Sequence, residues 1–250
     1  SEVEQLLAQT RVVCGTTVAL NASSELFSLK HFHLAIVDEA SQILEPHLIG
    51  LLSAHNGDEN AIDRFVLIGD HKQLPAVVQQ SEDESLVTEP DLRHIHLTNC
   101  RYSLFERLLK GFKTTQGYDP RYVYMLTRQG RMHTAIADFP SRQFYEGKLQ
   151  IVPLAHQQLL PQPCASANGI ARILSLRNVA FVDAPAPESS VNDKTNQVEA
   201  EMIAATIHQI YLLTRSTEKG FSTDHTVGVI VPYRNQIATI RGAIDRQGIA

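Results

Sequence analysis

Ile36-Val37-Asp38-Glu39-Ala40-Ser41-Gln42 is an apolar run that ends in two adjacent carboxylates. Its composition is typical of a buried parallel strand, which places Asp38 and Glu39 at the carboxyl end of that strand. No lysine or arginine stands beside them, so the pair favours a bound divalent cation. A strand-end turn that is merely acidic explains the same residues equally well. Other parts of the sequence have to distinguish a cation site from a plain turn.

The composition is that of an ordinary globular chain, with 250 residues of which 43% are hydrophobic and 20% are charged. This length allows a sizeable core and two domains. A formal net charge of −5 excludes a globally basic nucleic-acid binder. Contacts with phosphates would therefore have to come from a local patch or from backbone amides.

Three widely spaced cysteines, Cys14, Cys100 and Cys164, form no CxxC pair. This argues against a zinc site or a disulfide framework and favours a reducing compartment. The first ten residues are polar and acidic, and no stretch reaches the roughly 18 apolar residues of a membrane span. We therefore expect a cytoplasmic protein, or a nuclear one in a eukaryote. A helix-like start without methionine is typical of a fragment of something longer.

Apolar runs alternate with amphipathic segments along the chain, which predicts an α/β fold. Strands are expected at 11–14, 32–37, 64–68, 122–126, 179–183 and 226–231. Helices are expected at 41–52, 103–109, 134–142, 196–213 and 235–246. Apolar strands of this kind are typical of doubly wound parallel sheets, whose ligands bind at the carboxyl ends of the strands.

Two serines are predicted to cap helices. Ser41 would cap the helix that follows the acidic pair. Ser103 and Glu106 have the spacing of a capping box, which predicts a helix that begins after Ser103.

A second polar cluster, Gly69-Asp70-His71-Lys72-Gln73-Leu74-Pro75, follows the strand expected at 64–68. The two strand ends together resemble motifs II and III of superfamily 1 helicases. The resemblance continues through later blocks of the chain at 103–108, 129–133, 144–149, 196–200 and 228–236. The order of these blocks and their residues are most similar to the 1B branch of that superfamily.

The resemblance implies a RecA-like P-loop NTPase fold built from doubly wound parallel sheets. Residues 1–125 would form the C-terminal part of one RecA-like domain, and residues 126–250 the N-terminal part of a second. ATP would bind in the cleft between the two domains. The 1B branch also implies 5′-to-3′ movement on single-stranded DNA or RNA.

The same resemblance assigns catalytic roles. Asp38 would hold Mg²⁺ through its water shell, and Glu39 would orient the water that attacks the γ-phosphate. Gln73 would connect this phosphate or its water to the nucleic-acid side. Arg131 would be the arginine finger that stabilises the transferring phosphoryl group. Taken alone, Gln73 could be a solvated loop residue and Arg131 a surface charge.

Further residues follow from the family pattern. This pattern places three residues at the nucleotide: Gln129, Glu199 and Arg234. Thr16 and Thr17 match a loop that contacts the backbone of the single strand, since hydroxyl and N–H groups can hold phosphates without net positive charge. A tight turn in which threonine bonds the backbone is an equal alternative for these two residues. Asn196 could be only a helix cap.

The eleven histidines include His71 and His133, which lie inside the matched motifs. Neither has a second histidine or an acid at metal-ligand spacing. We therefore expect that protein side chains alone do not bind a metal ion at these motifs.

The chain departs from the family pattern in several places, among them Val231, where threonine often precedes Pro-Tyr. None of its 13 glycines lies in G-x-x-x-x-G-K-[ST], the Walker A loop that binds phosphates. We interpret the chain as an internal helicase fragment that runs from motif II through the motif IV region, without Walker A or the late motifs. By itself it should hydrolyse little or no ATP. Gly130 stands where the family usually has tyrosine, which could loosen the arginine-finger loop.

A different class of function remains open. The chain could be a degenerate helicase-like module that binds partners without turnover. The joint presence of Asp38, Glu39, Gln73 and Arg131 argues against this alternative, because nothing in a scaffold needs all four.

Overall fold

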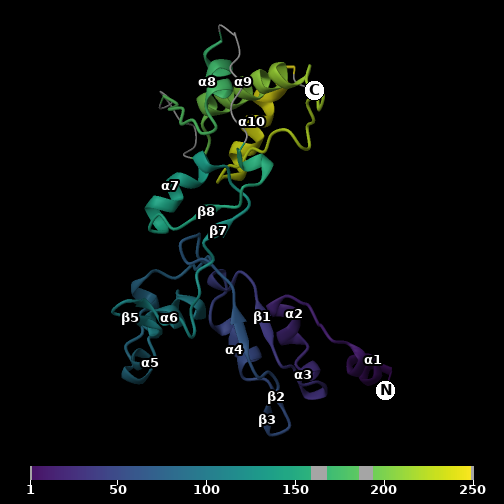
Figure 1. Ribbon diagram of the computed structural model, residues 1–250, viewed down its shortest axis with the longest axis vertical. Coiled ribbons are helices and arrows are strands. Elements are labelled where there is room, and N and C mark those ends of the chain that lie inside the picture. The colour runs from purple at the N-terminus through teal and green to yellow at the C-terminus, as the bar shows by residue number, and fades with distance from the viewer. Residues whose placement is uncertain (1, 159–167, 186–193, 249–250) are drawn as a thin grey trace. The chain divides into compact units, whose positions relative to one another are not determined.

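The computed structural model describes residues 2–158, 168–185 and 194–248. The chain divides into two compact units, Ser1–Met125 and Leu126–Ala250. Figure 1 shows the first in purple to teal and the second in teal to yellow.

The first unit is built on one pair of parallel strands. Strand β1 (Ala35–Val37) pairs with β4 (Phe65–Leu67), with Ala35 opposite Phe65 and Val37 opposite Leu67. Before β1 lie α1 (Glu2–Gln9), α2 (Thr17–Ala22) and α3 (Glu25–Leu29). Between the paired strands lie η1 (Ala40–Gln42), α4 (Pro46–Leu52), β2 (His55–Asn56) and β3 (Glu59–Asn60). After β4 come η2 (Asp83–Ser85), α5 (Pro90–His94), α6 (Leu104–Gly111), β5 (Lys113–Thr114) and β6 (Gly117–Tyr118).

The core of the first unit lies between this strand pair and its helices. Its buried members are Phe27, Leu48, Leu51, Ala61, Ile62 and Leu104. An ion pair of low exposure anchors α6 beside this core, since Arg107 Nε donates to Glu45 Oε2 at 2.8 Å. Gly50 on α4 allows α2 to approach, because a Cβ there would lie 2.4 Å from Asn21 Oδ1. These contacts tie both α6 and α2 to α4.

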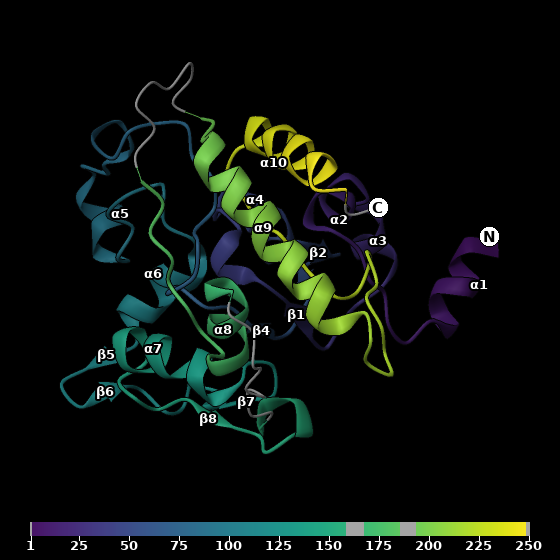
Figure 2. The same ribbon diagram turned by 90° about the horizontal axis from the view of Figure 1, so that it is seen from above.

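The second unit has a shorter parallel pair and three longer helices. Strand β7 (Arg128–Gln129) pairs with β8 (Gln150–Ile151), and α7 (Thr134–Phe144) connects them. Then follow η3 (Ala155–Gln158), α8 (Gly169–Leu176), α9 (Gln197–Thr214) and α10 (Arg234–Arg246). Figure 2 shows α10 running alongside α9. The buried residues of this contact are three alanines, Ala200, Ala204 and Ala243, together with the larger Ile240.

The structure confirms the predicted helices whose sequence signals are local. Helix α6 begins after Ser103 with a complete capping box, in which Ser103 Oγ accepts from Glu106 N at 3.2 Å. The helices expected at 134–142, 196–213 and 235–246 correspond to α7, α9 and α10. The chain is therefore a mixed structure of helices and strands.

Four of the six expected strands were wrong. The runs at 11–14, 122–126, 179–183 and 226–231 have no strand ladder. A strand is stabilised by hydrogen bonds to neighbours that are remote in sequence, and none of these described runs has such a neighbour. Several of their apolar side chains are consequently exposed, as for Val12 (75%), Phe181 (92%) and Ile230 (98%).

The predictions from composition concern thiols and membranes. Cys14 and Cys100 are free and exposed, whereas Cys164 lies outside the described residues. Within the described parts of the chain, no helix combines the length and the apolar character that crossing a bilayer requires.

Candidate active site

The acidic pair forms the turn that directly follows β1. Asp38 and Glu39 are both exposed, and Glu39 N donates to Asp38 Oδ1 at 3.0 Å. Gln42 Nε2 donates to Glu39 Oε2 at 3.4 Å. No lysine or arginine of the described residues forms an ion pair with either carboxylate. The turn thus presents carboxylate oxygens without a basic partner.

Strand pairing brings residues 69–75, here called the second loop, to the same sheet edge. The ladder continues beyond β1 and β4, because Ile68 N donates to Val37 O at 2.8 Å. Ala40 N then donates to Ile68 O at 2.7 Å. The acidic turn and the second loop therefore leave the sheet side by side.

Ser41 joins the acidic turn to the second loop. Its buried side-chain Oγ accepts from Asp70 N at 3.0 Å. The backbones approach so closely that a Cβ on Gly69 would lie 2.8 Å from Ser41 N. The prediction that Ser41 caps a helix was wrong, because α4 begins only at Pro46. The hydroxyl is used between the loops instead.

Asp70 organises the second loop from within. Its Oδ1 accepts from Lys72 N, and its Oδ2 accepts from Gln73 Nε2, both at 3.0 Å. The amide oxygen of Gln73 takes no part in the bond from Nε2 to Asp70. Gln73 is thereby held, exposed, on the loop that is bonded to the acidic turn.

His71, in the same loop, is held in its neutral form at neutral pH. Burial is the main cause that lowers its pKa from the ordinary value of 6.5, and the charge of Lys72 lowers it further. Asp70 and Glu106 act in the opposite direction. The charge of this loop therefore depends little on His71 at neutral pH.

In the second unit, the side chain of Gln129 closes the loop that carries Arg131. Gln129 Oε1 accepts from Arg131 N at 3.0 Å and from Met132 N at 2.7 Å. Gln129 Nε2 donates to Met132 O at 2.9 Å. Both ends of the amide are engaged inside the loop, and Arg131 is exposed on it.

Helix η3 holds the Arg131 loop from the other side. Gln157 is fully buried, and its Nε2 donates to Gln129 O and to Met132 O, each at 3.0 Å. His156 Nε2 lies 3.0 Å from Gly130 O. Gly130 therefore lies in a loop that three side chains fix, despite the freedom expected of glycine.

The N-termini of α9 and α10 are joined by one buried amide. Asn196 N donates to Gln236 Oε1 at 2.8 Å, and Gln236 Nε2 donates to Asn196 O at 2.9 Å. Asn196 also caps α9, because its Oδ1 accepts from Glu199 N at 3.1 Å. Glu199 and Arg234 thus lie, both exposed, in the first turns of two joined helices.

Thr16 and Thr17 form the start of α2. Thr16 is its N-cap residue, and its Oγ1 accepts from Ala19 N at 3.2 Å. This bond matches the alternative in which threonine bonds the backbone. His133 acts similarly at α7, where its Nδ1 accepts from Ala135 N at 3.1 Å.

Sequence reasoning missed two sets of residues that the fold positions. Gln157 belongs to no motif, and the partners of its Nε2, Gln129 O and Met132 O, are remote in sequence, so no local signal could have found this role. His31, His33 and Asp63 lie together in the first unit, and the His-x-His spacing on an extended segment was a signal for the first two.

Comparison with known proteins assigns both halves of the chain to one type of family. Two family models, each described as an AAA domain, match residues 1–81 and residues 100–249. Together they include the acidic turn, the second loop, the Arg131 loop and the joined starts of α9 and α10.

Similar proteins are named as helicases. The DNA replication ATP-dependent helicase/nuclease DNA2 of Gallus gallus is 28% identical over 246 residues, covering 98% of this chain and 20% of that protein. The DNA polymerase alpha-associated DNA helicase A of Saccharomyces cerevisiae is 28% identical over 260 residues, covering 97% of this chain and 34% of that protein. The chain thus spans only about a fifth to a third of the length of these two relatives.

Proposed function

We propose, since the chain belongs to the AAA-domain family of superfamily 1 helicases, that the protein containing these residues is an ATP-dependent helicase. It couples ATP hydrolysis to movement on single-stranded DNA or RNA and to duplex unwinding, in the cytoplasm or the nucleus. Family membership implies a P-loop NTPase fold. Within that fold we assign residues 1–125 to one RecA-like domain and residues 126–250 to a second.

One observation carries this proposal: the acidic turn and the second loop are hydrogen-bonded to each other at the end of β1 and β4. The bond from Asp70 N to Ser41 Oγ and the bond from Ala40 N to Ile68 O fix this joint. Ligands of parallel sheets bind at this edge. A turn that was merely acidic would need no such connection to a loop carrying Gln73.

The donor set of the turn fits Mg²⁺. This ion requires oxygen ligands and keeps several waters, so it is commonly bound through one or two carboxylates. Asp38 and Glu39 offer such oxygens, exposed and without a basic partner among the described residues. When bound, Mg²⁺ would neutralise charge on the phosphate oxygens.

Within the first unit, each side chain receives a distinct role. Asp38 holds the ion through water, and its Oδ1 is oriented by the N–H of Glu39. Glu39 orients the attacking water and polarises it toward the γ-phosphate. Gln73, anchored through Nε2 to Asp70, keeps its amide oxygen for that water or for a phosphate-bound group.

The second unit supplies positive charge and further nucleotide contacts. Arg131 is assigned as the arginine finger, and Gln129 lies in the same loop at the nucleotide. Glu199 and Arg234 contact the nucleotide from the joined helix starts. Thr16 and Thr17, in the first unit, are assigned to the backbone of the single strand. The Thr16 hydroxyl already caps α2, so Thr17 is the better candidate to contact that backbone through its hydroxyl.

The proposal is tested by ATP hydrolysis of the intact protein, with single-stranded DNA and single-stranded RNA as separate stimulants. Glu39→Gln should lower kcat by about 10²-fold or more, because the amide cannot polarise the water. Glu59→Gln is the matched control, since Glu59 is an exposed acid on β3 of the same unit. Its kcat should equal that of the wild type.

The outcomes separate two classes of function. Equal kcat in Glu39→Gln and the wild type would refute the catalytic assignment. Nucleic-acid binding by an intact protein that never hydrolyses ATP would instead identify an interaction module. The 250 residues alone, which contain no G-x-x-x-x-G-K-[ST], should hydrolyse little ATP.

A further inference from the structure

Residues 31–33 and 61–63 form a parallel bridge ahead of β1 and β4. Phe32 pairs with Ile62; Phe32 N donates to Ala61 O at 2.8 Å, and Asp63 N donates to Phe32 O at 3.1 Å. Side chains alternate between the two faces of extended backbone. Phe32 and Ile62 face the core, whereas His31, His33 and Asp63 lie on the outer face of the bridge.

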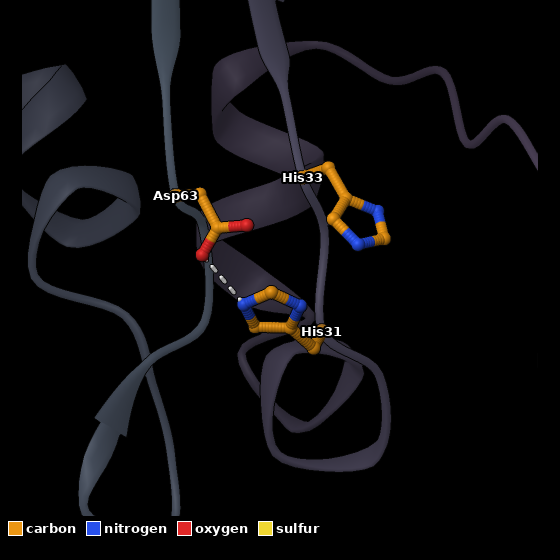
Figure 3. Close-up of side chains that lie close together, drawn as sticks. All are labelled: His31, His33 and Asp63. Atoms are coloured by element: carbon orange, nitrogen blue, oxygen red, sulfur yellow. Dashed lines mark hydrogen bonds and ion pairs between the residues drawn. The ribbon is translucent and has the colours of Figure 1, made fainter.

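Three potential metal ligands meet on this outer face. Figure 3 shows His31, His33 and Asp63 close together, on two adjacent segments of the chain. His31 Nε2 lies 2.8 Å from Asp63 Oδ1, and the rings of His31 and His33 meet edge to face with centroids 5.5 Å apart. One ligand atom from each residue lies within 4.8 Å of the others.

We propose that this cluster binds a divalent first-row transition-metal ion of the Zn²⁺ class. Two imidazoles and one carboxylate are ligands that Zn²⁺ accepts, whereas Mg²⁺ and Ca²⁺ require mostly oxygen. Three protein ligands leave at least one position for water. The site is separate from the Mg²⁺ proposed at the acidic turn, and it does not depend on helicase activity.

The required rearrangement is small. Ligand atoms at the Zn–N and Zn–O distances of about 2.0–2.1 Å stand roughly 3.4 Å apart in a tetrahedral site. The pair of His31 and Asp63 is already closer than this, and the widest spacing within the cluster exceeds it by little more than an ångström. The side chains of His33 and Asp63 are exposed, so rotation about their own bonds can close the gap. The metal ion would replace the proton between His31 and Asp63.

The backbone that carries these ligands is fixed in advance. Both bridging hydrogen bonds hold the two segments in register, and the ring of Phe32 packs on Phe27 at a centroid distance of 6.0 Å. Little ordering is therefore needed when an ion binds. Because the ligands come from two segments, the ion would clamp the chain before β1 to the chain before β4.

The cluster lies at the opposite end of β1 from the acidic turn. Asp38 follows His33 by five positions in the chain, which corresponds to about 16 Å of extended backbone. An ion at the cluster would therefore act on the stability of the strand pair and not on the phosphate.

Metal titration of the chelator-treated protein at pH 7.5 tests the proposal, because neutral imidazoles are required as ligands. We expect one equivalent of Zn²⁺ to bind in calorimetry, and Co²⁺ to produce a visible absorption band at the same stoichiometry. His33→Gln and Asp63→Asn should each weaken binding at least about tenfold. His94→Gln, at an exposed histidine of α5, is the matched control and should bind as the wild type does.

The two ligand variants change exposed side chains, and circular dichroism verifies that both remain folded. A wild-type protein that binds no Zn²⁺ overturns the proposal. Binding that survives both variants overturns it as well, because the ion then lies elsewhere among the histidines. Binding that Asp63→Asn abolishes and His33→Gln leaves intact would also overturn the three-ligand site. The added thermal stability that Zn²⁺ gives the wild type should be absent from both variants.

Discussion

Glu39 has a left-handed backbone conformation, with φ of 51°. This conformation costs a residue with a Cβ about 1–2 kcal/mol relative to an ordinary helical one. The turn tolerates the cost because the next residue is fixed, with Ala40 N bonded to Ile68 O. Strained residues of this kind concentrate at functional sites. The conformation of Glu39 is therefore consistent with a side chain that is positioned for chemistry.

Gly69 is the residue on which the joint between the acidic turn and the second loop depends. In Gly69→Ala the new methyl group would lie 2.8 Å from Ser41 N and 3.1 Å from Ser41 Oγ. One of the two loops must move, and the bond from Asp70 N to Ser41 Oγ should break. We expect the free energy of unfolding to fall by about 1–3 kcal/mol, measured by urea denaturation.

Gly228→Ala is the control for this prediction. No atom lies within 4 Å of a Cβ at Gly228, so the added methyl group meets open space. Its stability should equal or slightly exceed that of the wild type. Equal stability of Gly69→Ala and the wild type would show that the two loops are not held in this close contact.

His71 should make the protein less stable in mild acid. Its pKa is lower in the folded chain than the ordinary 6.5, so the folded chain binds fewer protons than the unfolded chain. The stability from neutral His71 is complete above pH 6.5 and is lost as the pH falls through the folded pKa. Denaturation at pH 7.5 and at pH 5.5 should therefore show a smaller loss in His71→Gln than in the wild type.

Lys72→Gln provides an internal check on the cause. The charge of Lys72 is the second contribution that lowers the pKa of His71, after burial. Removing that charge should reduce the acid-induced loss only partly. If the wild type and His71→Gln lose equal stability on acidification, His71 is not the group responsible.

At the scale of elements, η3 matters because it holds the Arg131 loop. In Gln157→Ala the two hydrogen bonds to Gln129 O and Met132 O are lost from a fully buried position. We expect a fall of about 1–3 kcal/mol in the free energy of unfolding. If Arg131 stabilises the transition state, kcat should also fall about tenfold or more with little change in KM, because a misplaced group loses catalysis.

Gln158→Ala is the matched control, since Gln158 is the adjacent residue and is exposed. It should change neither stability nor kcat. A Gln157→Ala protein that loses stability and keeps full kcat would limit η3 to a structural role. Comparing the change in kcat with the change in the free energy of unfolding thus distinguishes positioning of Arg131 from packing alone.

Helices were predictable from sequence to the extent that their signals are local. Ser103 and Glu106 are neighbours on one helical turn, and their capping box formed as predicted. The strand expected at 226–231 illustrates the opposite case, because this apolar run has no strand partner and Ile230 is exposed. Apolar composition indicates that a segment can be a strand, but only a remote partner makes it one.

The candidate site likewise combines features with local sequence signals and features that depend on remote contacts. Asp38 and Glu39 could be proposed as site residues from sequence because they are adjacent and follow an apolar run. The bond between Asp70 and Ser41 spans 29 residues, and that between Gln157 and Gln129 spans 28. No periodicity or spacing encodes such contacts, so the hydrogen bonds that hold these loops together were found only in the structure.

At the scale of the whole molecule, the proposed chemistry requires both units. Each has its own buried cluster, around Leu48 in the first unit and around Ile240 in the second. Glu39 belongs to the first unit and Arg131 to the second. If both act on one phosphoryl group, their contributions to catalysis cannot be independent, because residues that act as a unit in a single transition state are strongly non-additive.

The double variant Glu39→Gln with Arg131→Ala tests this coupling in the intact protein. Each single variant should lower kcat by about 10²-fold or more. If the two residues are coupled, the kcat of the double variant should be little lower than that of the more impaired single variant. The first change already removes most of the transition-state stabilisation that the second change would weaken. Independent effects would instead multiply, to about 10⁴-fold in single-turnover hydrolysis. A multiplicative loss would separate Arg131 from the reaction at Glu39 and assign it to a step other than phosphoryl transfer.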